Sequence, residues 1–410
     1  MRILHTSDWH LGRSLEGRDR IEEQEEFIAE MCEIADQEKV DLVLIAGDVF
    51  DTPNPSARAE QLFYQGLYDL AAGGRRGVIA IAGNHDNPDR IKASDPLAEQ
   101  LGITLLGLPK DQALVSRTRE DRVQRLAAGP GWLEVKVPGC DHSAVVIALP
   151  YPSEQRLREI LVEKLSEEDM QSSYSERVGA IFQSLSSNFR SDTVNLCMSH
   201  LFVRGGKESE SERPIQLGGS PTVDVEMLPW QKAQYIALGH LHRPQRVGGM
   251  EYARYSGSPL SYSFSEAGQA KAVYLVDCLP SQEARVQEIP LTKGNPLVRW
   301  EAHNGFSEVL KWCEESRDTK AWIDLTLYVD VPLSISQIKE LKDIRPNIIN
   351  IRPVLKNGVE LNYNPVNRIN LPVEELFRDF YRKGYQTEPG SELTRLFLEL
   401  LDEDKEGEAI

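Results

Sequence analysis

The sequence predicts an α/β protein with a layered sheet covered by helices. One observation is the stretch DLVLIAGDVFD, in which the apolar run Leu42–Ala46 is typical of a strand buried on both faces. Another is the N-terminal order of strand, helix, strand, helix and strand. Because such crossover connections are right-handed, this order builds a mainly parallel sheet with helices packed on it.

Apolar spacing predicts the two helices of this N-terminal unit. Between Ile21 and Ala35, apolar residues recur at helical intervals with Glu and Gln between them, so an amphipathic helix leads to the strand at Leu42. The segment 57–72 repeats this pattern, and the glycine pair beginning at Gly73 ends it.

The middle of the chain is less regular. Residues 111–131 are polar and Arg-rich without clear periodicity, which predicts a long loop before two strands near 132–137 and 144–149. A helix is expected over 175–189, followed by another strand. Residues 205–219, rich in Gly, Ser and Glu, predict a mobile surface loop. The segments YARYSGSPLSYSFSE and AVYLVD then supply further strands that close the sheet.

The chain is predicted to have four parts. These are a main domain at 1–288, a small α+β capping domain at 289–356, a linker at 357–372 and a helical segment at 373–410. The capping domain is expected to contain strands at 297–302, 321–329 and 348–354 and helices at 307–315 and 335–342. The C-terminal segment has apolar residues at helical spacing, which favours a docking element for a partner. Packing back onto the chain's own core is the alternative.

Composition limits the function classes. A net charge of −18 over 410 residues argues against a passive nucleic-acid binder, because such binding depends on basic residues that neutralise phosphates. Bound divalent cations would reverse the sign of the charge locally. We see no signal peptide and no apolar run of the roughly 18 residues that a membrane span needs, so a cytoplasmic protein with no membrane contact is expected.

Five predicted strands end in side chains that bind metals. The residues are Asp8, His10, Asp48, Asn84, His85, Asp86, His200, His240 and His242. Because the carboxyl ends of parallel strands meet at one edge of a sheet, we expect these side chains to lie together. The pattern predicts a two-metal centre.

The residue types indicate which ions would fit. The mixture of carboxylate and imidazole at Asp8 and His10 suits Mn²⁺, Fe²⁺ or Zn²⁺ better than Mg²⁺ or Ca²⁺. The two oxygens of Asp48 could bridge ions about 3.5 to 4 Å apart. Each residue also has a simpler interpretation: Asp48 as a helix N-cap, Asn84 as a turn residue, and any one histidine as a core residue.

His85 has a different predicted role. With its neighbour Asn84 turned to a metal, its side chain can point to the substrate and protonate a leaving oxygen. Asp86 is then expected to orient a histidine from behind the ligands.

The motifs resemble those of a known family. DxH at Asp8, GDxxD at Gly47, GNHD at Gly83, His200 and GHxH at Gly239 resemble, in order, the motif set of the calcineurin-like metallophosphoesterases. This resemblance implies a sheet sandwich flanked by helices. Four segments more narrowly resemble the SbcD family of bacterial exonuclease subunits: HTSDWHLG, AGDVFD, IALGHLHRPQ and YSGSPLSYSFSE.

The resemblance implies a set of roles. One metal would be held by Asp8, His10, Asp48 and His242, and a second by Asp48, Asn84, His200 and His240. It also implies manganese, double-strand 3'–5' exonuclease and single-strand endonuclease activity on DNA, and roles in DNA repair, recombination and replication. The implied partner is an SbcC-type coiled-coil ABC ATPase, with a homodimer of the nuclease inside a heterotetramer. Archaeal and eukaryotic relatives carry a substrate-contacting histidine where this chain has Asp51. We therefore do not count Asp51 as a metal ligand and expect it, like Asp86, to lie next to the ligands.

The resulting hypothesis is metal-assisted phosphodiester hydrolysis with His85 serving the departing oxygen. A phosphatase or small-molecule phosphodiesterase on the same site is the first alternative, although such an enzyme needs neither the capping domain nor the tail. A scaffold that has lost catalysis is the second alternative. It predicts that some metal ligands are missing, but all the expected ligands are present in the sequence.

Overall fold

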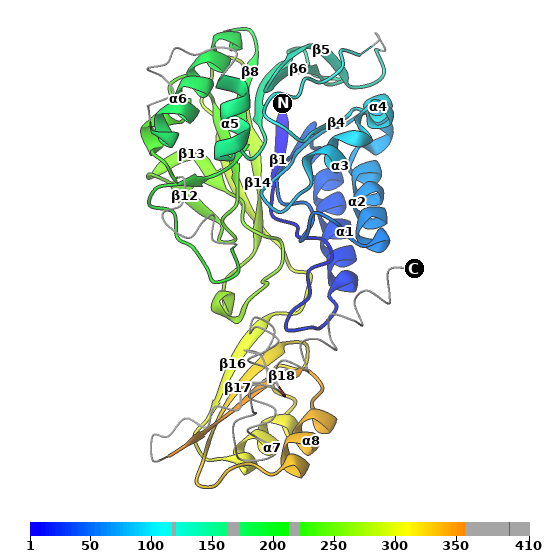
Figure 1. Ribbon diagram of the computed structural model, residues 1–410. Coiled ribbons are helices and arrows are strands. Elements are labelled where there is room, and N and C mark those ends of the chain that lie inside the picture. The colour runs from blue at the N-terminus through cyan, green and yellow to red at the C-terminus, as the bar shows by residue number, and fades with distance from the viewer. Residues whose placement is uncertain (117–119, 162–172, 213–221, 357–392, 394–410) are drawn as a thin grey trace. The chain divides into compact units, whose positions relative to one another are not determined.

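The structure, a computed structural model, describes residues 1–116, 120–161, 173–212, 222–356 and 393 (Figure 1). The chain separates into two compact units. The first contains Met1–Arg299 with Asp318–Asp324, and the second contains Trp300–Arg317 with the described residues from Leu325 onward. The predicted C-terminal helices at 373–410 lie outside the described residues, apart from Leu393.

A six-stranded sheet forms one half of the first unit. Its strand order is β15-β14-β1-β2-β3-β4, and the four strands β1 to β4 run parallel. The strands are β1 (Arg2–Thr6), β2 (Leu42–Ala46), β3 (Gly77–Ile81), β4 (Ile103–Leu106), β14 (Ala272–Asp277) and β15 (Arg285–Pro290). Helices α1 (Ile21–Gln37) and α2 (Ala57–Leu70) pack on its outer face through an apolar cluster that includes Phe27, Phe63 and Val43. The predicted strand at β2 and both predicted helices are confirmed.

A seven-stranded sheet forms the other half. Its strand order is β12-β13-β11-β8-β7-β6-β5. The strands are β5 (Gln124–Gly129), β6 (Trp132–Lys136), β7 (Ala144–Leu149), β8 (Val194–His200), β11 (Tyr235–Gly239), β12 (Gln245–Val247) and β13 (Met250–Tyr255). Helices α5 (Glu154–Leu161) and α6 (Tyr174–Leu185) lie along its outer side in Figure 1.

The inner faces of the two sheets share one apolar core. Leu44 and Ile79 of the first sheet belong to the same buried cluster as Val146 and Met198 of the second. The molecule's main unit is therefore a helix–sheet–sheet–helix sandwich, which confirms the layered α/β prediction.

Short elements complete the unit. They are the helices α3 (Pro88–Ala93) and α4 (Asp95–Ala98), the paired strands β9 (Phe202–Val203) and β10 (Thr222–Val223), and 3₁₀ turns at Ala72–Gly74, Glu99–Leu101, Ser186–Asn188, Val225–Met227 and Phe264–Glu266. Within the described part of the chain, no helix is both long enough and apolar enough to cross a membrane.

The prediction of a single loop over 111–131 is wrong, because the segment contains strand β5. Arg125 lies on this strand and is only 2% exposed. Its guanidinium donates to both carboxylate oxygens of Asp95, at 2.7 and 3.1 Å, and to the carbonyl of Ile103. Arg125, one of the arginines that make the segment look like a solvated loop, is thus buried on the edge strand of the sheet and paired with Asp95.

The small α+β module makes up most of the described part of the second unit, although its strands β16 and β17 begin in the first. Its elements are β16 (Leu297–Ala302), α7 (Phe306–Glu314), β17 (Trp322–Val329), α8 (Ile335–Ile344) and β18 (Ile348–Leu355), with strand order β16-β17-β18. All five elements match the predicted ones to within a few residues. The guanidinium of Arg317 lies over the rings of Trp300 and Trp312, 5.5 and 4.5 Å from their centroids.

Candidate metal centre

The carboxyl ends of β1, β2, β3, β8 and β11 meet where the two sheets approach one another. Glycines allow this approach: a Cβ on Gly239 would lie 1.8 Å from the carbonyl oxygen of Ala46, and one on Gly47 would lie 2.3 Å from Nδ1 of His200. The predicted ligands from both sheets therefore enter one shared space.

Several of these side chains leave the strands from a left-handed backbone. Asp8, His10, Asp48 and His240 have φ values of 54°, 45°, 48° and 111°. Non-glycine residues adopt this region at a cost and are concentrated at functional sites. The strained turns aim four of the seven predicted ligands inward.

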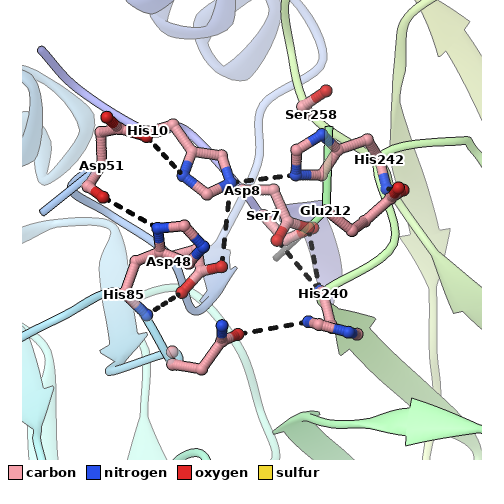
Figure 2. A network of polar contacts seen from close by, with 12 residues as sticks. Ser7, Asp8, His10, Asp48, Asp51, His85, Glu212, His240, His242 and Ser258 are labelled. Atoms are coloured by element: carbon pink, nitrogen blue, oxygen red, sulfur yellow. Dashed lines mark hydrogen bonds and ion pairs between the residues drawn. The ribbon is translucent and has the colours of Figure 1, made fainter. Parts of the chain in front are cut away.

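One group of ligands, which we call the Asp8 group, consists of Asp8, His10 and His242. Their ligand atoms lie within 4.8 Å of one another, and all three residues are buried. The Nε2 atoms of His10 and His242 are 3.0 Å apart, and Figure 2 shows the two imidazole rings facing each other. Asp8 is fixed by the hydroxyl of Ser7, at 2.5 Å, and by the backbone N–H of His240.

The other group, which we call the Asp48 group, consists of Asp48, Asn84, His200 and His240. Nε2 of His200 lies 3.3 Å from Asp48 Oδ2 and 2.8 Å from Asn84 Oδ1. Nδ1 of His240 lies 3.2 Å from the same oxygen of Asn84. Asp48 Oδ2 is also 3.7 Å from Nε2 of His10, so one carboxylate oxygen lies close to both groups.

His85 lies at the edge of these groups and is 8% exposed. Its backbone N–H donates to Asp48 Oδ1 at 2.9 Å, and its Nδ1 donates to the backbone carbonyl of Asp51 at 2.8 Å. It lines a pocket of about 430 Å³ together with Arg13, Asp51 and residues 210–212.

Asp86 differs from its predicted role. Instead of orienting a histidine, its buried carboxylate accepts hydrogen bonds from the backbone N–H groups of Val49, Phe50 and Gly83. It therefore ties the turn after β2 to the turn after β3. The main-chain carbonyl of Asp51 orients His85. The carboxylate of Asp51 lies 3.7 Å from Arg13 Nη1 and 3.8 Å from His10 Nδ1.

Burial and neighbouring charges act against each other in the electrostatics of the site. It raises the pKa of the Asp8 carboxyl to about 6, and it lowers the pKa of His240 to about 3. At Asp48 burial acts in the same direction as at Asp8, but the nearby His200 and His85 outweigh it and hold the Asp48 pKa well below its ordinary value. The site thus gathers buried groups whose charged forms need a compensating charge.

The donor atoms fit a pair of divalent cations. Two imidazole nitrogens face each other across 3.0 Å beside the buried carboxylate of Asp8, and a second imidazole pair converges on the oxygens of Asp48 and Asn84. Nitrogen and oxygen donors in this mixture suit Mn²⁺, Fe²⁺ or Zn²⁺.

The residues behind His242 were not predicted from the sequence. Ser211, Glu212, Glu266 and Lys271 all contact His242 or each other, although Ser211 and Glu212 belong to the predicted surface loop at 205–219. Ser211 is only 5% exposed. Its position in a polar, Gly-rich segment gave no signal of burial, since only the fold brings it to a ligand 31 residues away.

Comparisons with known proteins agree with this geometry. The family model for calcineurin-like phosphoesterase matches residues 1–244. The SbcD subunit of the nuclease SbcCD from Bacillus subtilis (strain 168) is 44% identical over 413 residues, covering 100% of both chains. The SbcD subunit from Rhodobacter capsulatus is 34% identical and covers 73% of this chain and 71% of its own. That from Escherichia coli (strain K12) is 27% identical, with coverages of 80% and 78%. The chain belongs to the calcineurin-like phosphoesterases and, within them, to the SbcD family of nuclease subunits.

Proposed function

We propose that this chain is the nuclease subunit of a DNA end-processing complex, with double-strand 3'–5' exonuclease and single-strand endonuclease activity. Family membership makes it a phosphodiester hydrolase. The observation that carries the proposal is the shared oxygen of Asp48, 3.3 Å from His200 and 3.7 Å from His10, which joins two buried ligand groups beside an open pocket.

We infer that Asp8, His10, Asp48 and His242 hold one ion, and that Asp48, Asn84, His200 and His240 hold the other. The mixture of donors suits Mn²⁺, Fe²⁺ or Zn²⁺, and the family resemblance favours Mn²⁺ among them. When bound, two such ions would neutralise charge on the phosphate and lower the pKa of an attacking water.

His85 is the proposed proton donor. A backbone carbonyl can only accept a hydrogen bond, so the contact with Asp51 keeps a proton on Nδ1. In the doubly protonated imidazolium form, Nε2 would deliver its own proton to the departing oxygen and leave the neutral ring behind. The 2.9 Å hydrogen bond from the backbone N–H of His85 to Asp48 Oδ1 holds this residue beside the ligands.

Arg13 supplies positive charge to the same pocket. Its guanidinium lies over the ring of Tyr262, 5.3 Å from the centroid, and donates to the carbonyl of Ser211 at 2.8 Å. A guanidinium held in this way is suited to a phosphate oxygen of the DNA strand.

The proposed organisation retains the four parts predicted from the sequence. Residues 1–288 form the nuclease domain, 289–356 the capping domain, 357–372 the linker and 373–410 the segment that binds the ATPase. The partners would be DNA and an SbcC-type coiled-coil ABC ATPase, with two copies of the nuclease in a heterotetramer in the cytoplasm.

A nuclease assay tests the function. We expect the chain, with its ATPase partner, to cut linear duplex DNA from its 3' ends in Mn²⁺ and to do so more slowly in Mg²⁺. The same preparation should nick single-stranded circles. Hydrolysis of small nucleotide esters without any cleavage of DNA would support the phosphatase alternative instead.

Deletion of residues 373–410 tests the partner segment. We expect the shortened chain to lose co-purification with the ATPase while keeping the melting temperature and metal content of the full chain. Undiminished co-purification would overturn the assignment of this segment.

A further inference from the structure

We propose that Ser211 and Glu266 form a hydrogen-bond relay that positions His242 and selects the imidazole tautomer that can bind a metal. This inference depends on the proposed function, because it takes His242 to be a metal ligand. Ser211 lies outside the segments that carry the family resemblance, whereas Glu266 is the last residue of one of them, YSGSPLSYSFSE, and has no assigned role. The two are positioning residues, since they act on the reaction through His242.

The relay is short and buried. Oγ of Ser211 lies 2.6 Å from Nδ1 of His242 and 2.6 Å from Oε1 of Glu266. His242, Ser211 and Glu266 are 1%, 5% and 0% exposed. Water therefore has little access to compete for these hydrogen bonds, and their geometry controls how the imidazole is oriented.

Counting protons gives the direction of both bonds in the relay. Oγ of Ser211 also lies 2.7 Å from Oγ of Ser209, which has a hydroxyl proton of its own to donate, so the proton of Ser211 is available to Glu266. A carboxylate only accepts, so the single hydroxyl proton of Ser211 goes to Glu266. The serine oxygen must then accept from His242, which requires the imidazole proton to be on Nδ1. Nε2 is left with a lone pair, and this is the atom that faces Nε2 of His10 in the Asp8 group.

Lys271 keeps Glu266 in the carboxylate form that this direction requires. Its ammonium contacts Glu266 Oε2 and also donates to the carbonyl of His242, at 2.9 Å, and to Oγ of Ser258, at 3.0 Å. The backbone N–H of Tyr262 adds a further bond to Oε1.

The relay makes His242 different from the other oriented histidines. Nδ1 of His200 donates to the carbonyl of Ala46 in strand β2, and Nδ1 of His85 donates to the carbonyl of Asp51. Those acceptors are main-chain atoms next to the ligands themselves. His242 depends instead on a serine side chain, from a segment held in place by Arg13 and by a bond from the N–H of Glu210 to Ser265.

Removal of the hydroxyl should therefore weaken one ion and leave the other in place. Loss of a group that orients a metal-binding histidine typically costs about 10- to 100-fold in metal affinity. We expect an effect of that size on the ion of the Asp8 group, and less than about threefold on the ion of the Asp48 group, because His200 keeps its main-chain acceptor.

The test compares Ser211→Ala with Ser143→Ala in the full-length metal-free protein, titrated with Mn²⁺ and followed by electron paramagnetic resonance. Ser143 is a matched control, since its hydroxyl donates to the carboxylate of Glu134 at the same 2.6 Å, and Arg190 pairs with Glu134 much as Lys271 pairs with Glu266. We expect Ser211→Ala to bind one of two ions about 10- to 100-fold more weakly, and Ser143→Ala to bind both like the wild type.

Nitrogen-15 spectra of histidine-labelled, metal-free protein give a readout that a merely structural role would not change. His242→Asn assigns the signals. We expect a protonated Nδ1 and a bare Nε2 at His242 in the wild type, and a mixture of tautomers in Ser211→Ala.

Three results would overturn the relay. The first is a wild-type His242 with its proton on Nε2, and the second is an unchanged affinity for both ions in Ser211→Ala. The third is a Ser211→Ala variant that binds both ions equally more weakly and melts at a lower temperature than Ser143→Ala. A wild-type protein that binds no ions would instead contradict the proposed function, so the two failures are distinguishable.

Discussion

The two ligand groups are held in place by different means. In the Asp48 group, His200 is oriented by the main-chain carbonyl of Ala46, and it lies in register with Gly239 on the neighbouring strand. In the Asp8 group, polar side chains provide the support: the neighbouring Ser7 for Asp8, and Ser211 and Glu212, far away in the sequence, for His242. One group is fixed by the sheets and the other by a polar network.

This difference indicates where the site is rigid and where it can be adjusted. A strand carbonyl moves only if the sheet moves, so the Asp48 group should tolerate changes outside the sheets. The Asp8 group should respond to single changes in the segments that follow the strands. Asp48 is the exception to this division, because one of its oxygens lies close to both groups.

The largest effect is expected from Asp48→Ala, which removes the feature common to both groups. Both ions should be lost, and the backbone N–H of His85 loses its acceptor as well. We expect DNA cleavage to fall by more than about 10³-fold, beyond the usual cost of losing one stabilising group. Cleavage rates and bound manganese, measured on the same sample, check this.

Asn84→Ala is the comparison for Asp48→Ala, because Asn84 belongs to the Asp48 group alone. It should lose one ion and retain part of the activity. An equal loss in both variants would mean that Asp48 does not bridge the groups.

His85→Ala should separate chemistry from metal binding. The variant should bind two ions and DNA like the wild type, because its imidazole belongs to neither group. Cleavage should fall by about 10²- to 10⁴-fold, the usual contribution of a general acid. Single-turnover cleavage and DNA-binding measurements check both halves of this statement. Unimpaired cleavage would remove His85 from the mechanism.

Gly47→Ala is designed to break the group fixed by the sheets. Gly47 has φ of 90°, and an added Cβ would lie 2.3 Å from Nδ1 of His200, where the bond to Ala46 is made. Backbone strain costs about 1 to 2 kcal/mol, and the overlap should add about 1 to 3 kcal/mol to the loss in free energy of unfolding.

Gly139→Ala is the control for this strain. Gly139 has φ of 82°, and no atom lies within 4 Å of its added Cβ. It should show the backbone cost alone and keep both ions, whereas Gly47→Ala should lose the ion of the Asp48 group. If Gly47→Ala and Gly139→Ala have equal free energies of unfolding in chemical denaturation, the close packing of Gly47 against His200 does not contribute to stability.

The same division explains how much could be predicted from the sequence. Strand β2 and helix α1 are encoded by local apolar patterns, and the predicted ligands follow directly from strand ends, so both the layered sheet and the convergence of the ligands were accessible. Parallel strands bring their carboxyl ends together whatever the rest of the chain does.

The residues that could not be predicted are those whose role depends on distant contacts. Arg125 looks solvated until Asp95 is placed beside it, and Ser211 looks like a loop residue until the fold brings it to His242. Asp86 is the last residue of the GNHD motif, yet its partners are main-chain N–H groups, which carry no signal in sequence. Long-range polar contacts, unlike apolar periodicity, leave no local pattern.

The smallest expected effect, from Glu212→Gln, sharpens the comparison on the side of the network. Glu212 Oε1 accepts from the backbone N–H of His242 at 2.8 Å, and an amide oxygen can still accept there without the charge. Weakening one hydrogen bond by about 0.5 to 1.5 kcal/mol should raise the dissociation constant of one ion by about two- to tenfold. Glu210→Gln makes the same charge change on an exposed residue of the same segment and should leave binding unaltered. Equal effects of the two variants on Mn²⁺ titrations would mean that Glu212 acts through net charge and that its bond to His242 contributes nothing measurable.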